Sequence, residues 1–357
     1  MNLSSIIYDG KRIDTSQALE LFDWDLLKLG KAADFRRHLI KDDEEVGFII
    51  DRIINITNIC EAGCRFCAFH ARAGHIAAYT LSIDDILAKV QELADRGGSQ
   101  VMLQGGLHPE WRIEDVIQIV SAVKRSFPNM WLHSFSPAEI VHIGRKSRLS
   151  VDETVIALKE AGVDSVPGAS DLLVDDIRKQ VAPKKLTTEQ WRTVMRCLAR
   201  NGMMSSATMT YGMGETPKQR VEHLEVIRGI QDECGHIIAF IAWSFAPGGT
   251  RMSHIRQATS VDYLRMAAIS RIYLDNVVFL QAGWLTEGLQ TAQLALSMGA
   301  NDMGGVLTEE RVIQATGGAH HTDRNAMIHL IRNAGKTPVL RDSQYRVLKR
   351  FHEGTRS

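Results

Sequence analysis

Three cysteines, Cys60, Cys64 and Cys67, are the residues of this chain whose type and spacing most clearly indicate chemistry. They lie in one short segment directly after the apolar run Ile53–Ile56, with no fourth cysteine close by in the sequence. Three thiolates can hold three irons of a [4Fe–4S] cube and leave the fourth iron open to a small molecule. The spacing therefore favours a reactive iron–sulfur site over a purely structural one.

Structural zinc is the alternative interpretation of these thiols. Zinc takes four ligands, and either His70 or His75 could supply the fourth. Structural zinc sites usually combine two Cys-x-x-Cys-like halves, however, and this sequence contains no second half. A zinc-stabilised binding protein without catalysis is thus the less favoured alternative. The two other cysteines, Cys197 and Cys234, lie in and just after amphipathic helical patterns and are expected to be inert.

The composition fits an enzyme that acts on a small molecule. The chain has 357 residues, and its 42 Lys and Arg balance its 42 Asp and Glu. Nucleic-acid binders usually carry a basic excess, so DNA and RNA are not expected partners. The N-terminus lacks a signal-peptide pattern, and no apolar run is long enough to span a membrane. An odd cysteine count argues against a disulfide framework, so we expect a cytoplasmic protein without membrane insertion.

The hydrophobic pattern predicts an α/β fold in which strands and helices alternate. Strands are expected at Ile53–Thr57, Gln100–Leu103, Met130–Phe135, Ser165–Val166, Ser206–Tyr211, Ile237–Phe245, Val277–Ala282 and near Ala300–Met303. Helices are expected at Ile83–Arg96, Ile113–Lys124, Val151–Ala161, Thr188–Asn201, Arg220–Asp232, Val261–Leu274 and Glu287–Met298. This alternation favours a parallel sheet, and its count and length match a (β/α)8 TIM-type barrel. An open doubly wound sheet is the rival, but no Gly-x-Gly-x-x-Gly turn supports it.

The barrel is expected to occupy residues 51–321. Residues 1–50 precede it and predict an N-terminal helical extension, with helices over Thr15–Leu29 and Lys31–Lys41. Residues 322–357 are charged and predict a C-terminal helical tail packed on the barrel, with a helical pattern at Asn325–Asn333. Neither end shows a core of its own.

Several segments rich in glycine, proline and polar or aromatic residues fall where the predicted strands end. They are Gln104–Pro109, His133–Pro137, Val166–Asp171, Thr208–Glu215, Trp243–Gly249 and Gln281–Trp284. In a barrel the carboxyl ends of the strands carry the active site. One glycine pair or one histidine proves little, since His133 alone would more often be a hydrogen-bonded structural histidine. The joint placement of these segments with the cysteine loop is what indicates a site.

The Cys-x-x-x-Cys-x-Phe-Cys pattern after the first strand of a probable barrel resembles the radical S-adenosylmethionine (SAM) superfamily. The resemblance implies that Cys60, Cys64 and Cys67 bind a [4Fe–4S] cluster. It also implies that the methionine moiety of SAM chelates the open iron, and that one-electron reduction yields methionine and a 5′-deoxyadenosyl radical. Flavodoxin or ferredoxin is the implied reductant.

Further segments resemble a narrower group, the futalosine-pathway enzymes of menaquinone biosynthesis and the related deazaflavin-cofactor synthases. The segments shared with the whole group are Leu103–Pro109, Leu132–Glu139 and Ala207–Gly212. Those most similar to the branch that cyclises dehypoxanthine futalosine are Phe240–Pro247, Tyr273–Asn276, Gly283–Gly288, Gly299–Gly304 and Leu340–Tyr345. The implied reaction is hydrogen abstraction from the substrate sugar, addition of the carbon radical to the benzoate ring, and loss of an electron and a proton. Aminofutalosine synthase, which adds the adenosyl radical instead, is the alternative.

The resemblance also implies roles for residues around the cofactor. Phe66 would lie beside the adenine of SAM. The strand-two positions whose backbone receives the methionine amino group are Gln104, Gly105 and Gly106. The positions expected near the cofactor ribose and carboxylate are Ser134, Asp171 and Arg178. An arginine there can pair bidentately with a carboxylate.

The remaining candidates follow from strand-end placement. The proton acceptors proposed for the last step are His133 and Glu215, with His108 a weaker choice. A substrate carboxylate would need a cation, for which Arg251 or Arg271 is a candidate.

Two segments depart from the family pattern. His70 and Ala71 stand where the family usually has Tyr and Arg. The strand-four segment Pro167–Asp171 is one residue shorter than usual and carries Asp for Glu, so its carboxylate reaches less far. A divergent radical SAM enzyme with a related substrate therefore remains a second alternative.

Overall fold

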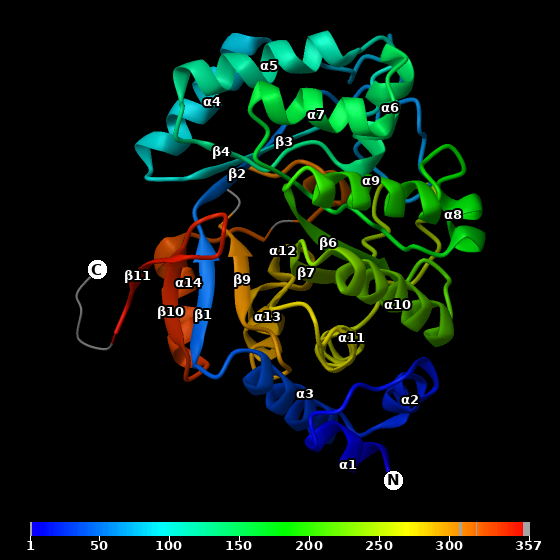
Figure 1. Ribbon diagram of the computed structural model, residues 1–357, viewed down its shortest axis with the longest axis vertical. Helices are drawn as coiled ribbons and strands as arrows, with labels where there is room; N and C mark the ends of the chain where they lie inside the picture. The colour runs from blue at the N-terminus through cyan, green and yellow to red at the C-terminus, as the bar shows by residue number, and fades with distance from the viewer. Residues whose placement is uncertain (1, 307–308, 319, 353–357) are drawn as a thin grey trace.

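The computed structural model describes residues 2–306, 309–318 and 320–352, and a curled, mostly parallel sheet lies at its centre (Figure 1). Its strands are β1 (Glu45–Ile49), β2 (Asp51–Asn55), β3 (Gln100–Gln104), β4 (Trp131–Leu132), β5 (Ser165–Val166), β6 (Met204–Tyr211), β7 (Ile237–Ser244), β8 (Phe279–Gln281) and β9 (Asp302–Gly305). Strands β2, β3 and β4 pair in that order, and β5 to β9 pair in sequence order. The predicted α/β barrel class is confirmed.

Two junctions join the strand groups into one wall. A parallel bridge between His133 and Ser165 continues β4 into β5. On the other side β1 pairs with β9, and the chain passes through Ile50 directly into β2. The carboxyl ends of the strands therefore face a common interior, which is the arrangement that places the cysteine loop and the later strand ends together.

Helices follow the strands and cover the outside of the sheet (Figure 1). They are α4 (Ile83–Asp95), α5 (Ile113–Ser126), α6 (Pro137–Ser147), α7 (Val151–Ala161), α8 (Asp175–Val181), α9 (Thr188–Arg200), α10 (Pro217–Cys234), α11 (Ser260–Tyr273), α12 (Trp284–Glu287) and α13 (Leu289–Ala295). Capping boxes begin α6, α7, α9, α10 and α11, each with a Ser or Thr whose side chain accepts an N–H of the first turn. All seven predicted helices are present, while α6, α8 and the short α12 were not predicted.

Strand β4 is shorter than the sequence predicts. We expected it over Met130–Phe135, but β4 covers Trp131–Leu132 alone. Phe135 has a φ of 58°, in the left-handed region that a strand cannot contain. The backbone turns there toward Ser136, whose hydroxyl caps α6.

The N-terminal extension contains α1 (Leu3–Tyr8), α2 (Thr15–Glu20), a 3-10 turn (Leu21–Asp23) and α3 (Leu26–Ile40). The single helix expected over Thr15–Leu29 is divided, because Asp25 accepts the N–H groups of Leu27 and Lys28 and so begins a new helix. Strand β1 also lies in this extension and was not predicted. It enters the main sheet between β9 and β10.

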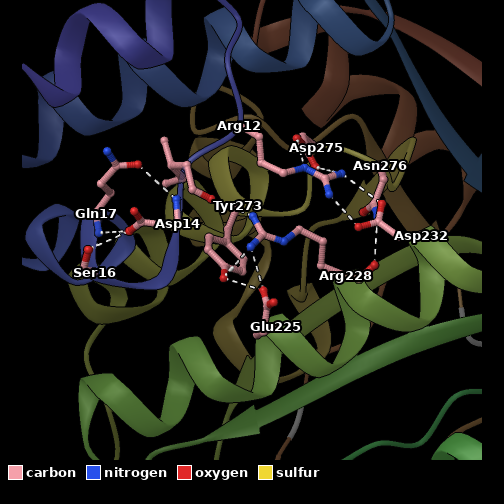
Figure 2. A network of polar contacts seen from close by, with 11 residues as sticks. Arg12, Asp14, Ser16, Gln17, Glu225, Arg228, Asp232, Tyr273, Asp275 and Asn276 are labelled. Carbon is pink, nitrogen blue, oxygen red and sulfur yellow. Dashed lines mark hydrogen bonds and ion pairs between the residues drawn. The ribbon is translucent and has the colours of Figure 1, made fainter. Parts of the chain in front are cut away.

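Figure 2 shows how the extension is held against α10 and α11. The Arg12 guanidinium donates to the Asp232 carboxylate at 2.5 and 3.0 Å and to Asp275 at 2.9 Å. Arg228 of α10 donates to the Ile13 carbonyl at 2.8 Å and to the Tyr273 hydroxyl at 2.7 Å. These contacts fix the extension to the outside of the barrel, away from the strand ends.

The C-terminal tail is only partly helical. Its helix α14 (Arg324–Asn333) confirms the predicted pattern, but β10 (Thr337–Arg341) and the antiparallel β11 (Val347–Arg350) follow it and extend the sheet beyond β1. The alternation in these short strands is weak, since β11 is largely exposed. Nowhere in the described ranges is there a helix both long and apolar enough to cross a membrane.

Candidate active site

A cavity of about 460 Å³ occupies the interior of the barrel. The cysteine loop closes one end, the strand ends form the wall, and residues after β10 reach the other end. The residues of the opposite end are Asp51, Gln100, His133, Gln281, Arg341 and Tyr345. A deep chamber of this kind is suited to binding a small molecule while excluding water.

All three cysteines of the loop line this cavity, and none forms a disulfide. The loop is fixed by main-chain bonds: Cys60 donates its N–H to the Ala71 carbonyl at 3.0 Å, and Cys67 donates to the Cys64 carbonyl at 3.4 Å. Ala71 donates in turn to the Asn58 carbonyl at 2.8 Å. The backbone thus turns all three thiols toward one space.

The electrostatics of the loop suit thiols that bind a metal centre. Burial raises the pKa of Cys64 to about 12 and also raises the pKa of Cys67. Each thiolate would repel the other two, while the N–H groups of Phe69 and His70 bond to the Cys67 sulfur and oppose its pKa rise. Three thiolates side by side, with Cys64 buried and Cys60 and Cys67 partly buried, become favourable when a metal centre supplies positive charge.

The arrangement fits a cluster better than a single ion. Among the residues that the structure describes, no group of three or more His, Cys, Asp or Glu side chains is arranged to hold one metal ion. Zinc draws all its ligands to within about 2.3 Å of one point. A [4Fe–4S] cube binds each thiolate through a different iron, so its ligands stand farther apart. Three thiols without a fourth cysteine nearby are the donor set that such a cube takes when one iron stays open.

Gly105 and Gly106, which follow β3, pack directly against the cysteine loop. A Cβ on Gly106 would lie 2.2 Å from the Ile59 carbonyl oxygen and 2.8 Å from the Cys60 Cβ. The Gly105 N–H donates to the Glu139 carboxylate at 2.9 Å, and burial raises the pKa of that carboxyl group. Both glycines and the preceding Gln104 line the cavity, as the sequence predicted for this segment.

In the segment after β5, positive charge beside the cysteines comes from Lys185, which the sequence analysis did not single out. Lys185 lines the cavity, pairs with the Asp171 carboxylate at 2.6 Å, and lies 5.8 Å from the centre of the Phe66 ring. Burial alone would lower the pKa of Lys185, but Asp171 outweighs it and the pKa is raised. Asp171 and Phe66 line the cavity as well. A cation, a carboxylate and an aromatic ring thus meet beside the thiols.

Arg178 lies behind this group and does not line the cavity. Its guanidinium donates to the carbonyls of Ser170 and Leu186 at 2.9 Å each, and its distance to Asp171 is 3.8 Å. These bonds support a turn in which Ala169 and Asp171 have φ of 34° and 48°. Arg178 therefore shapes the turn after β5, and the cation that lines the cavity here is Lys185.

Ser134 and Glu215 are likewise engaged by the protein itself. Ser134 is fully buried, and its hydroxyl accepts the Leu103 N–H at 3.2 Å. The Glu215 carboxylate accepts N–H bonds from Gly212 and Met213 and pairs with Arg220 at 2.8 Å. Neither side chain lines the cavity. Both hold the turns that follow their strands.

His133 is the predicted proton acceptor that the structure places in the cavity. One ring nitrogen, Nδ1, lies 2.8 Å from the Ser165 hydroxyl, which also accepts the Trp131 indole N–H at 2.7 Å. Burial lowers the pKa of His133 to about 4, so the ring is neutral near pH 7. His108 stacks on Trp111 with ring centres 5.0 Å apart, outside this cavity.

The two candidate cations for a substrate carboxylate lie elsewhere. Arg251 is exposed and donates to the Gly63 carbonyl on the outer side of the cysteine loop. Arg271 is buried against the Gly299 carbonyl, at 2.9 Å. Among the described lining residues, the lysines and arginines are Lys185 and Arg341.

Arg341 reaches the cavity from β10, the strand that the sequence did not predict. It donates to both oxygens of the Asp302 carboxylate, at 2.5 and 2.9 Å, and its guanidinium lies 3.7 Å from the Tyr345 ring centre. Gln281 donates to the Tyr345 hydroxyl. The C-terminal segment thereby supplies one end of the chamber with a fixed polar group.

Comparison with known families agrees with this geometry. The model of the radical SAM superfamily matches residues 54–227, and the model described as the CofH/MqnC C-terminal region matches residues 234–353. The chain belongs to the radical SAM superfamily and is an enzyme of that class. More narrowly, it belongs with the relatives of cyclic dehypoxanthine futalosine synthase, which confirms the resemblance predicted from the sequence. Membership implies a [4Fe–4S] cluster and SAM as cofactors.

Several relatives share nearly the whole chain. Cyclic dehypoxanthine futalosine synthase of Halalkalibacterium halodurans is 39% identical over 97% of this chain and 94% of its own. The enzyme of the same name from Streptomyces coelicolor is 40% identical over 94% and 86%. The 5-amino-6-(D-ribitylamino)uracil–L-tyrosine 4-hydroxyphenyl transferase of Methanococcoides burtonii is 37% identical over 94% and 95%.

Solved structures confirm the fold. Methylornithine synthase has a TM-score of 0.75 at 16% identity, with 94% of this chain and 97% of that chain covered. The [FeFe]-hydrogenase maturase HydG from Carboxydothermus hydrogenoformans has a TM-score of 0.74 at 13% identity, covering 96% and 80%.

Proposed function

We propose that this radical SAM enzyme cyclises dehypoxanthine futalosine, a step toward menaquinone. The observation that carries the proposal is the cavity that is lined both by the three free cysteines and by the polar group around Arg341. Two relatives of that activity, at 39% and 40% identity over nearly the whole chain, support the substrate.

The cofactor assignment follows from the same loop. We assign the cluster to Cys60, Cys64 and Cys67, and SAM to the space bounded by Phe66 and the segment Gln104–Gly106. When bound, the cluster and SAM together supply a 5′-deoxyadenosyl radical. The protein's part is to hold the substrate sugar beside this end of the cavity and to keep water away.

The opposite end would receive the aromatic part of the substrate. There Arg341 is held by Asp302 and stacked on Tyr345, so its direction is fixed before the substrate binds. Neutral His133 lies on the wall of the same chamber and has one ring nitrogen engaged by Ser165. We assign to His133 the acceptance of the proton lost when the ring regains aromaticity.

A second candidate activity comes from the transferase relatives. At 37% identity, the Methanococcoides burtonii enzyme is nearly as similar as the futalosine enzymes. As its name states, that enzyme transfers a 4-hydroxyphenyl group from tyrosine to a ribitylaminouracil, and the paired polar residues at the Arg341 end would also suit such a polyhydroxylated ligand. Aminofutalosine synthase remains the third related activity.

The test is a substrate panel with the anaerobically reconstituted enzyme. Dehypoxanthine futalosine should give free 5′-deoxyadenosine and a product lighter by two hydrogens, read by mass spectrometry. Tyrosine with 5-amino-6-(D-ribitylamino)uracil should give no product. The reverse result would assign the transferase activity, and incorporation of adenosyl carbon into the product would assign adenosyl addition.

A further inference from the structure

The outer side of the cysteine loop carries a concentration of positive charge. The residues concerned, here called the basic rim, are Arg65, Arg145, Lys146, Lys179, Lys184 and Arg251. The chain as a whole balances 42 basic against 42 acidic residues, so this concentration is local and not a consequence of composition. In the cysteine loop, the end of α6 and the segment from α8 to Lys185, the acids are Glu61, Asp175 and Asp176, fewer than the six bases of the rim.

Hydrogen bonds and ion pairs join the segments of the rim to the cysteine loop. Arg145 and Lys146, at the end of α6, pair with Glu61 at 2.8 and 3.3 Å, and Glu61 directly follows Cys60. The Arg65 N–H donates to the Val181 carbonyl at the end of α8, at 2.7 Å. Figure 1 shows α6 and α8 on the same side of the molecule.

The other contacts complete the surround. The N–H of Arg251 donates to the Arg65 carbonyl at 3.0 Å, and its guanidinium donates to the Gly63 carbonyl. Lys179 and Lys184 lie within three residues of Val181 on either side. The side chains of Arg145 and Lys179 are 68% and 76% exposed. The rim therefore surrounds the outer side of the loop, while the cavity occupies its inner side.

Arg65 is exposed and directly follows the buried Cys64 in the chain, so the molecular surface reaches the cysteine loop at this residue. An electron carrier that delivers electrons to a centre on this loop must approach it from outside. A basic surface attracts an acidic partner and accelerates its association.

We propose that the basic rim is the docking surface for a small acidic one-electron carrier protein of the flavodoxin or ferredoxin kind. The inference rests on the proposed cluster at Cys60, Cys64 and Cys67. To charge the enzyme, one electron passes from the reduced carrier to the cluster, so that the carrier is oxidised by one electron and the cluster is reduced by one. No bond forms between the two proteins.

The test compares two charge-reversed variants with two reductants. Lys179→Glu/Lys184→Glu changes the rim, and Lys31→Glu/Lys349→Glu makes the same change in net charge on α3 and β11, away from α6 and α8. Formation of 5′-deoxyadenosine is followed with reduced flavodoxin and, separately, with dithionite. Binding of oxidised flavodoxin to the reconstituted enzymes is measured by calorimetry.

The rim variant should lose about tenfold in flavodoxin-driven kcat/KM and in flavodoxin affinity at low salt, with the difference vanishing near 1 M salt. Its dithionite-driven rate and the control variant should match wild type. An equal loss in the control variant, an equal loss with dithionite, or unchanged flavodoxin binding would overturn the proposal. If the wild-type enzyme binds flavodoxin but makes no 5′-deoxyadenosine with either reductant, the proposed function is overturned and the docking surface stays supported. If the rim binds RNA tightly and does not bind flavodoxin, the proposed docking surface is overturned.

Discussion

Substitutions in the buried pair of Arg341 and Asp302 should affect the stability of the protein and its activity differently. The Arg341 side chain is 4% exposed and that of Asp302 is fully buried, and two hydrogen bonds join them. Arg341→Met leaves the Asp302 carboxylate buried without its cation. Breaking a buried pair in this way costs about 3–5 kcal/mol of unfolding free energy.

A second substitution tests the cause of that loss. Asp302→Asn in the Arg341→Met background removes the unpaired charge, so the double variant should recover at least about 1–2 kcal/mol of unfolding free energy over the single variant. Its cyclisation activity should stay low, because the fixed cation at the end of the cavity is still absent. Urea unfolding followed by circular dichroism gives the free energies, and product formation gives the activity.

Two results would refute this reasoning. If Arg341→Met cost less than about 1 kcal/mol, the pair would not be the buried interaction described. If the double variant regained full activity, Arg341 would act only as a structural partner of Asp302.

Three further predictions address the other parts of the site. Gly106→Ala should prevent iron–sulfur loading, read from absorbance after reconstitution, because its Cβ would lie 2.2 Å from the Ile59 carbonyl oxygen; full loading would contradict the packing. Lys185→Met should weaken SAM binding by about tenfold in calorimetry, since it removes the ammonium group 2.6 Å from the Asp171 carboxylate and leaves it only Arg178 at 3.8 Å, whereas Lys184→Met should not. Because the pKa of His133 falls to about 4 in the folded state against about 6.5 unfolded, acidification from pH 6.5 toward 4 should remove stability by up to about 1.4 kcal/mol per pH unit. The His133→Gln variant should lose less unfolding free energy per pH unit on acidification. An unchanged dependence on pH would contradict the attribution of this loss to His133.

The parts of the fold that carry strong periodicity were predictable from sequence. Strand β5 and helix α7 have the predicted bounds because buried apolar runs and amphipathic helices repeat with distinct periods. Strand β9, expected near Ala300–Met303, lies two residues later at Asp302–Gly305. Strand β4 was overestimated, since the positive φ of Phe135 leaves no trace in the hydrophobic pattern. Helix α8 was missed because it has only seven residues.

The candidate site divides in the same way. The cysteine spacing and the strand-two glycines are local in sequence and were identified. The family resemblance marked the segment Leu340–Tyr345, which contains Arg341. Its place in the cavity was not indicated, because Arg341 pairs with Asp302 across 39 residues and comes from a strand with little pattern. Lys185 lies in an irregular turn after α8, and only its contact with Asp171 places it beside the thiols. Arg178, a better local match for an anion ligand, turned out to bind backbone carbonyls.

The central claim is that Cys60, Cys64 and Cys67 hold the cluster that initiates the radical reaction. The most direct test is formation of 5′-deoxyadenosine from SAM by the anaerobically reconstituted enzyme with dithionite, comparing Cys64→Ala with Cys197→Ala. Cys197 is buried in α9, outside the cavity lining, and serves as the matched control. We predict that Cys197→Ala cleaves SAM as wild type does and that Cys64→Ala forms no 5′-deoxyadenosine. Cleavage by Cys64→Ala at the wild-type rate would contradict the account.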